Sequence, residues 1–150
     1  MGIKSKIEKR LVTLYENGMI STQKQVDDYI TSYFDGVADV DSIPQEELRK
    51  MMEQVKEQFR CAFYRPFYFT FGSSKQFPFQ NGYIVLYEED IRAAARKFKS
   101  LYPNLYEPDL LNCSDYYSLE KWKEITQKFY KDEAPLKVIG KGGYFYEYSR

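Results

Sequence analysis

The residues that could do chemistry in this chain are carboxylates, lysines and two cysteines, because its 150 residues include no histidine. Without imidazole, the chain cannot form Ser-His-Asp or Cys-His nucleophile systems or the usual zinc sites that activate water. Cys61 and Cys113 lack the CxxC spacing and indicate reduced, mostly buried thiols. The sequence reveals no catalytic set, metal site or cofactor-binding pattern, so it favours a protein that is not an enzyme.

The most concentrated carboxylates are Glu88, Glu89 and Asp90, which precede a predicted helix. Negative side chains at this position stabilise the positive end of the helix dipole. We therefore interpret them as structural rather than as an acid–base pair or a metal site.

A glycine-rich run, Gly140-Lys141-Gly142-Gly143, has a composition that could bind phosphate through backbone amides and a lysine. A phosphate-binding loop should lead from a strand into a helix, whereas residues 144–148 have the pattern of a strand. The run therefore predicts a hairpin turn. An alternative function of the protein is that of a small-ligand or nucleotide-binding module with a tyrosine-lined pocket. The cations that could hold phosphate in such a pocket are Lys141, Arg92, Arg96 and Lys97.

Tyrosine is unusually abundant, with 15 tyrosines beside 11 phenylalanines. Each buried hydroxyl needs a partner, so several tyrosines are expected at the surface, where they serve as interface anchors. The predicted partner-binding residues lie at the tip of the loop 73–80 and in the last predicted strand: Phe77, Pro78, Phe79, Tyr144, Tyr146 and Tyr148. The three tyrosines would share one strand face and could stack bases. However, 22 basic and 22 acidic residues cancel, which disfavours nucleic acid as a partner.

The chain before Pro66 predicts three amphipathic helices. The first covers residues 3–17 and ends at Gly18. The second starts with a Thr22–Gln25 capping box and ends at Gly36, and the third has Ser42 as its cap and Pro44 in its first turn.

The chain after Arg65 predicts alternating strands and helices. Strands 67–71 and 83–87 should pair antiparallel across the loop 72–82. A helix over residues 91–101, a short strand at 110–113, a helix beginning near Ser118 and a terminal hairpin of residues 136–139 and 144–148 should follow.

These elements predict an α+β protein. Residues 1–65 would form a helical region of about three helices, and residues 66–150 an aromatic-rich α+β domain. The sheet would be small and antiparallel or mixed, with two helices packed on one face. The two regions could also form one compact unit.

No segment of the sequence approaches the length of a membrane span or shows a secretion signal. We therefore expect a cytoplasmic protein without a membrane partner.

Part of the sequence, from Phe67 to Ile125, resembles small, poorly characterised proteins of bacterial phages and integrated mobile elements. The similar positions are Phe69-Thr70-Phe71-Gly72, Phe77-Pro78, Gly82-Tyr83, Asn112-Cys113, Tyr117 and Trp122. The resemblance implies a cytoplasmic accessory protein, from a group whose small members often bind and inhibit host or rival machinery.

We therefore predict a non-enzymatic binding protein whose aromatic loop and sheet edge engage another protein, as an inhibitor of a bacterial defence or host enzyme. A homo-oligomer is also compatible with the sequence.

Overall fold

The computed structural model describes residues 2–40 and 43–150, apart from the side chains of residues 38–40 and 125–127. The chain divides into two compact units. Unit 1 comprises Met1–Phe63 and Gly143–Arg150, and unit 2 comprises Tyr64–Gly142. The first junction lies close to the boundary predicted at residue 65. The return of the last residues to the helical unit was not predicted.

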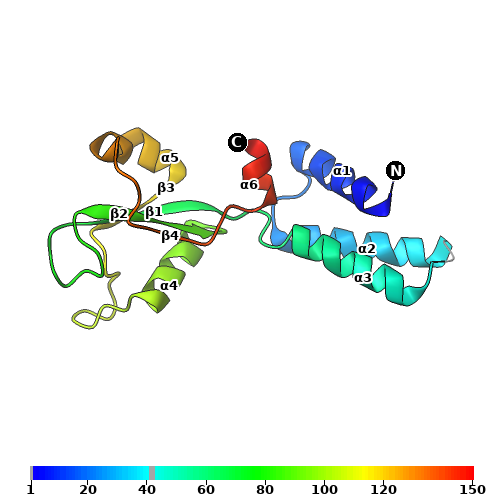
Figure 1. Ribbon diagram of the computed structural model, residues 1–150, viewed down its shortest axis with the longest axis horizontal. Helices are drawn as coiled ribbons and strands as arrows, with labels where there is room; N and C mark the ends of the chain where they lie inside the picture. Colours follow the sequence, from blue (N-terminus) through cyan, green and yellow to red (C-terminus); the bar gives the residue numbers. More distant parts are fainter. Residues whose placement is uncertain (1, 41–42) are drawn as a thin grey trace. The chain divides into compact units, whose positions relative to one another are not determined.

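Unit 1 is built from four helices, which are α1 (Ile3–Glu16), α2 (Gln23–Val40), α3 (Gln45–Gln58) and α6 (Tyr144–Ser149) (Figure 1). The three predicted helices at the N-terminal end are confirmed. The Gln25 amide nitrogen donates to Thr22 Oγ1 at 3.2 Å, and Gln25 Oε1 accepts from the Thr22 amide at 3.1 Å, so the capping box is also confirmed.

Helix α2 is longer than predicted. The expected end of the second helix at Gly36 is wrong, because α2 continues through this glycine to Val40. Glycine weakens a helix without breaking it when flanking residues pack, as Phe34 does with 4% of its surface exposed. The predicted cap at Ser42 lies outside the described residues.

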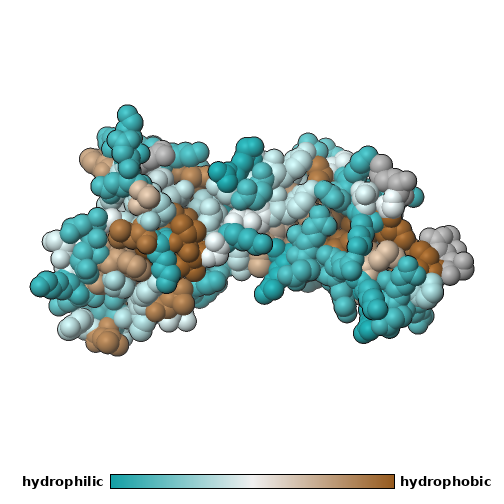
Figure 2. Space-filling model, viewed as in Figure 1, coloured by the Kyte–Doolittle hydropathy of each residue, from teal (hydrophilic) through white to brown (hydrophobic). Residues whose placement is uncertain are grey.

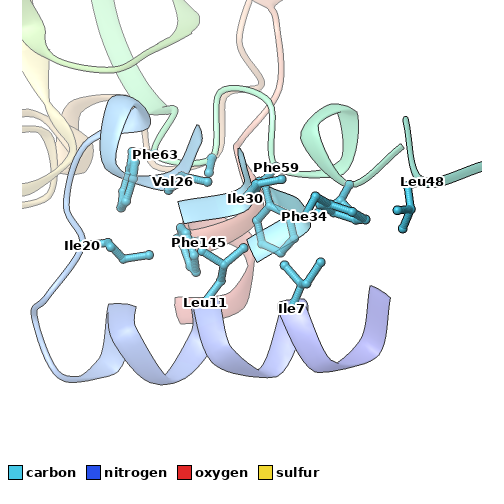
Figure 3. Close-up of a cluster of buried hydrophobic side chains, with 12 residues drawn as sticks. Ile7, Leu11, Ile20, Val26, Ile30, Phe34, Leu48, Phe59, Phe63 and Phe145 are labelled. Carbon is cyan, nitrogen blue, oxygen red and sulfur yellow. The ribbon is translucent and has the colours of Figure 1, made fainter. Parts of the chain in front are cut away.

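The core of unit 1 joins all four helices, as Figure 3 shows. Its buried residues are Ile7, Leu11, Ile20, Val26, Ile30, Phe34, Leu48, Val55, Phe59, Ala62, Phe63 and Phe145. Phe145, from α6, is 1% exposed and stacks on Tyr15 with ring centroids 4.4 Å apart. The C-terminal helix is therefore an integral part of this core.

The predicted terminal hairpin is wrong, because Tyr144–Ser149 forms a helix instead of a strand. Aromatic residues favour strands on average, but tertiary contacts override this preference. The Phe145 amide donates to the Ala62 carbonyl at 2.9 Å, and its ring is buried among the helices of unit 1. Tyr144, Tyr146 and Tyr148 consequently do not share a strand face.

Unit 2 contains a four-stranded mixed sheet in the order β3-β1-β2-β4. Its strands are β1 (Arg65–Phe71), β2 (Gly82–Glu88), β3 (Asp115–Ser118) and β4 (Lys137–Ile139). The predicted antiparallel pair β1/β2 is confirmed, with Arg65 opposite Glu88 and Phe71 opposite Gly82. β4 runs parallel to β2, and β3 begins after the predicted strand 110–113.

Both faces of the sheet are covered. On one face, Phe69 stacks on Phe98 of α4 (Ile91–Leu101) with centroids 4.5 Å apart. On the other face, Tyr68 stacks on Trp122 at 4.5 Å. Trp122 follows the short helix α5 (Leu119–Lys121) and begins the π-helical turn Trp122–Thr126, which a 3₁₀ turn, Gln127–Tyr130, continues.

The α+β class is therefore confirmed, but the packing of both helices on one face is wrong. Side chains alternate between the two faces of a strand. Residues 82–86 of β2 are all buried, so each face needs its own cover. In the part of the chain that the structure describes, no helix combines the length and apolar character needed to cross a bilayer.

Candidate partner-binding surface

The aromatic loop between β1 and β2 folds back onto the core of unit 2. The rings of Phe77 and Phe79 lie 6.1 Å and 5.3 Å from that of Phe71, and both side chains are half-buried, as is Pro78. Gln80 Nε2 donates to the Phe77 carbonyl at 2.7 Å, which closes the loop. These predicted partner-binding residues therefore anchor their own loop.

A more exposed apolar segment lies in the connection between α4 and β3. We call four exposed residues, the last residue of α4 and three in the connection after it, the α4-end surface: Leu101, Leu105, Tyr106 and Leu110. Leu105 is 84% exposed and Tyr106 is 70% exposed. Figure 2 shows a small apolar group, in brown, at the tip of this connection, separate from the larger brown area on unit 2. Large apolar side chains exposed together are typical of interaction sites.

The connection that carries this surface has a defined conformation. Asn104 Oδ1 accepts hydrogen bonds from the amides of Tyr106 at 3.0 Å and Glu107 at 2.9 Å. The Leu110 amide donates to the Glu107 carbonyl at 2.9 Å. An asparagine that binds backbone amides in this way fixes a turn. Leu105 and Tyr106 are thus held outward by a preformed loop.

The aromatic loop packs against Tyr102, the residue after Leu101. The rings of Phe79 and Tyr102 meet edge to face at 5.4 Å, and Tyr102 also contacts Phe98 at 5.3 Å. Tyr102 directly follows Leu101, so the loop packs against the start of the α4-end surface. The sequence reasoning missed this surface. The available signal was the apolar pair Leu105-Tyr106 between Pro103 and Pro108, a stretch in which neither a helix nor a strand was predicted.

The predicted tyrosines of the C-terminal segment lie in unit 1, on α6. Tyr144 donates to Glu8 Oε1 at 2.7 Å, and burial, together with this bond, raises the pKa of Tyr144 to about 12. The Tyr148 ring lies 6.5 Å from that of Tyr144 with nearly parallel planes, and Arg150 lies over the Tyr146 ring at 5.6 Å. Tyr144 is therefore engaged inside its own unit.

The cations proposed for the alternative function lie on two separate segments of unit 2. Arg92 and Arg96 are exposed and Lys97 is half-buried on α4, while Lys141 is exposed in the glycine-rich run. Contrary to expectation, this run leads from β4 into α6 instead of forming a hairpin turn. The Phe145 amide at the start of α6 already donates to Ala62, so it is not available to an anion.

The described residues also contain no cluster of three or more cysteine, aspartate or glutamate side chains that could hold a metal ion. Both cysteines are unpaired and half-buried. Burial, assisted by Asp115, raises the pKa of Cys113 to about 12, so this thiol stays protonated and weakly nucleophilic.

Comparison with known proteins finds no matching protein-family model, no significantly similar curated protein and no significantly similar solved structure.

Proposed function

We propose that this protein is a non-enzymatic binding protein that engages another protein through the α4-end surface. The observation that supports this most directly is the exposure of Leu105 and Tyr106 on a loop that Asn104 holds in one conformation. Apolar anchors that are ordered before binding lose little conformational entropy when the partner arrives.

The expected contribution of these anchors can be estimated from their exposure. Burying a fully exposed leucine contributes about 1.5–3 kcal/mol, and tyrosine is enriched among the residues that dominate binding energy. Loss of both side chains should therefore weaken binding by about 2–4 kcal/mol, which is at least about thirtyfold in Kd.

The chemistry of the loop restricts the partner. Glu107 and Asp109 are exposed beside the apolar anchors. A complementary surface would present an apolar pocket with a basic rim. The resemblance to proteins of phages and mobile elements suggests a bacterial defence or host enzyme as the source of such a pocket, with inhibition as the consequence of binding.

Copurification from a bacterial lysate, followed by affinity measurement on the isolated pair, tests this proposal. We expect the wild type to retain a partner that the double variant Leu105→Ser/Tyr106→Ser loses. Phe129→Ser is the matched control, because Phe129 is 69% exposed in the same unit but lies outside the α4-end surface. Equal retention by the double variant would refute the proposal.

Two further measurements complete the test. Asn104→Ala should weaken binding by freeing the loop, whereas Asn104→Asp, which keeps an acceptor oxygen, should weaken it less. Analytical ultracentrifugation would reveal a concentration-dependent dimer of the wild type. If the double variant abolished such a dimer, the surface would serve self-association and the proposed partner would be wrong.

A further inference from the structure

A groove between α1 and α2 of unit 1 combines positive charge with tyrosine rings. Its volume is about 540 Å³, and its lining includes Lys6, Lys9, Arg10, Thr13, Tyr29 and Tyr33. The α1 residues are spaced three and four apart, so their side chains project from one face of the helix. The volume lies in the range of small-molecule sites.

The charge in this groove is not balanced locally. None of the described residues that line it is acidic, and its three cations form no ion pair with described residues. Like charges at helical neighbours repel each other. Although the net charge of the whole chain is zero, this groove is locally positive, and a bound anion would relieve the repulsion between its cations.

The tyrosines occupy the α2 side of the groove. Their rings lie 6.2 Å apart and are inclined by 43°, and both side chains are half-buried. Burial raises the pKa of Tyr29, while the nearby positive charge of Arg10 acts in the opposite direction. Arg10 and Tyr29 are thus close enough for one ligand to contact both.

We propose that this groove binds a nucleotide, with its phosphates against the three cations and its base against the faces of Tyr29 and Tyr33. Lysine and arginine bind phosphate through charge-assisted hydrogen bonds, and tyrosine rings accept stacked bases. This site is distinct from the α4-end surface, and its ligand differs in chemistry from the proposed protein partner.

The groove continues past Lys9 and Thr13, which also line a second groove with Ser5, Glu8, Tyr144 and Tyr148. The second groove carries both a cation and a carboxylate, so it suits a base better than a phosphate. A free nucleotide and a nucleotide of a single-stranded nucleic acid both offer the phosphate and base that the first groove would bind. Only the nucleic acid is long enough to extend into the second groove.

Isothermal titration with adenosine, pyrophosphate, ATP and a short single-stranded oligonucleotide tests the proposal. We expect ATP to bind at least about tenfold more tightly than adenosine or pyrophosphate, because only ATP uses both the cations and the rings. Lys9→Gln/Arg10→Gln should weaken ATP binding by about tenfold or more. Tyr33→Leu should weaken ATP binding but leave pyrophosphate binding unchanged.

Arg92→Gln/Arg96→Gln is the matched control, because it removes two exposed positive charges from unit 2. Equal weakening by this control would show that only net charge matters and would overturn the site. No saturable ATP binding, or equal affinity for pyrophosphate and ATP, would also overturn it. The oligonucleotide could bind more tightly than ATP. If Tyr148→Ala then lowers its affinity to that of ATP and leaves ATP binding unchanged, the bound nucleotide belongs to a single-stranded nucleic acid.

Discussion

Gly143 is the position where a single methyl group should disturb the fold most. A Cβ atom built on Gly143 would lie 1.9 Å from the Cys61 carbonyl oxygen and 2.5 Å from the Ala62 carbonyl carbon. These neighbours are backbone atoms, which cannot rotate away as a side chain could. Gly143→Ala therefore requires the start of α6 to move by about 1 Å or more, since interiors are close-packed.

This movement affects the residue that fixes α6 in the core. Phe145 would lose its hydrogen bond to Ala62, which contributes about 0.5–1.5 kcal/mol. Its ring would also lose part of the packing against Tyr15 and Phe63, and complete removal of a buried phenylalanine side chain costs about 3–5 kcal/mol. We expect Gly143→Ala to lower the free energy of unfolding of unit 1 by about 2–4 kcal/mol.

Guanidinium unfolding measured with two probes checks this expectation. Far-UV circular dichroism reports mainly the helices of unit 1, whereas the fluorescence of Trp122, the single tryptophan, reports unit 2. The dichroism midpoint should fall, and the fluorescence midpoint should move less. Phe145→Ala added to Gly143→Ala should cost less than Phe145→Ala alone, because the ring would already be displaced.

Gly36→Ala provides the opposite control. Gly36 lies inside α2 with no neighbour within 4 Å of a built Cβ, so alanine should stabilise the helix by about 0.5–1 kcal/mol. If Gly143→Ala stayed within about 0.5 kcal/mol of the wild type, α6 could not be docked against Cys61 and Ala62 as described.

Two further predictions concern hydrogen bonds inside unit 1. The raised pKa of Tyr144 means that the stability contributed by its protonated hydroxyl is complete below pH 10 and is lost as the pH rises through about 12. In a tyrosinate absorbance titration, Tyr144→Phe should remove the ionisation step near pH 12. Gln23 donates to the Phe59 carbonyl at 3.1 Å and accepts from the Ala62 amide at 2.8 Å, so Gln23→Ala should destabilise unit 1 by about 1–3 kcal/mol in chemical unfolding. An unchanged midpoint would mean that water replaces both bonds.

The elements with strong local signals were predictable from the sequence. Asp90 lies at the start of α4, where the acidic residues before the apolar period predicted a helix to begin, and it caps this helix by accepting from the Ala93 amide at 2.8 Å. Asn81 takes the left-handed conformation, with φ of 54°, at the turn before β2. In each case the residues that decide the structure lie within a few positions of one another.

Helix α6 was not predictable in this way, because its conformation depends on distant residues. Its contacts reach Ala62 and Tyr15, and Tyr15 bonds to Ser149 across 134 positions of sequence. The local aromatic pattern pointed to a strand. The nearest local hint was Gly143, whose missing side chain allows close contact with another backbone segment.

The candidate surface shows the same limit. Phe77 and Leu105 are both apolar residues in loops, yet Phe77 is half-buried whereas Leu105 is 84% exposed. The difference arises because Phe71 and the end of α4 lie next to the loop that carries Phe77 and Phe79. Sequence composition identified apolar loops but could not show which loop the sheet and α4 would cover.

The order of the units along the chain links their stabilities. Unit 2 is inserted between Phe63 and Gly143 of unit 1, so docking α6 on α1 requires closure of a long loop. Closing a flexible loop of this length costs about 4 kcal/mol or more in chain entropy. The folded sheet reduces this cost, because Phe67 of β1 and Ile139 of β4 both lie opposite Leu86 of β2.

The first and last strands of unit 2 are therefore separated by only one strand, or about 10 Å, at the end of the sheet where the chain enters and leaves. A folded unit 2 holds the two ends of the insertion close together, whereas an unfolded one leaves α6 on a long flexible tether. Destabilising the sheet should consequently weaken the docking of Phe145, although the two lie in different units. By the same linkage, loss of α6 docking should make unit 2 easier to unfold.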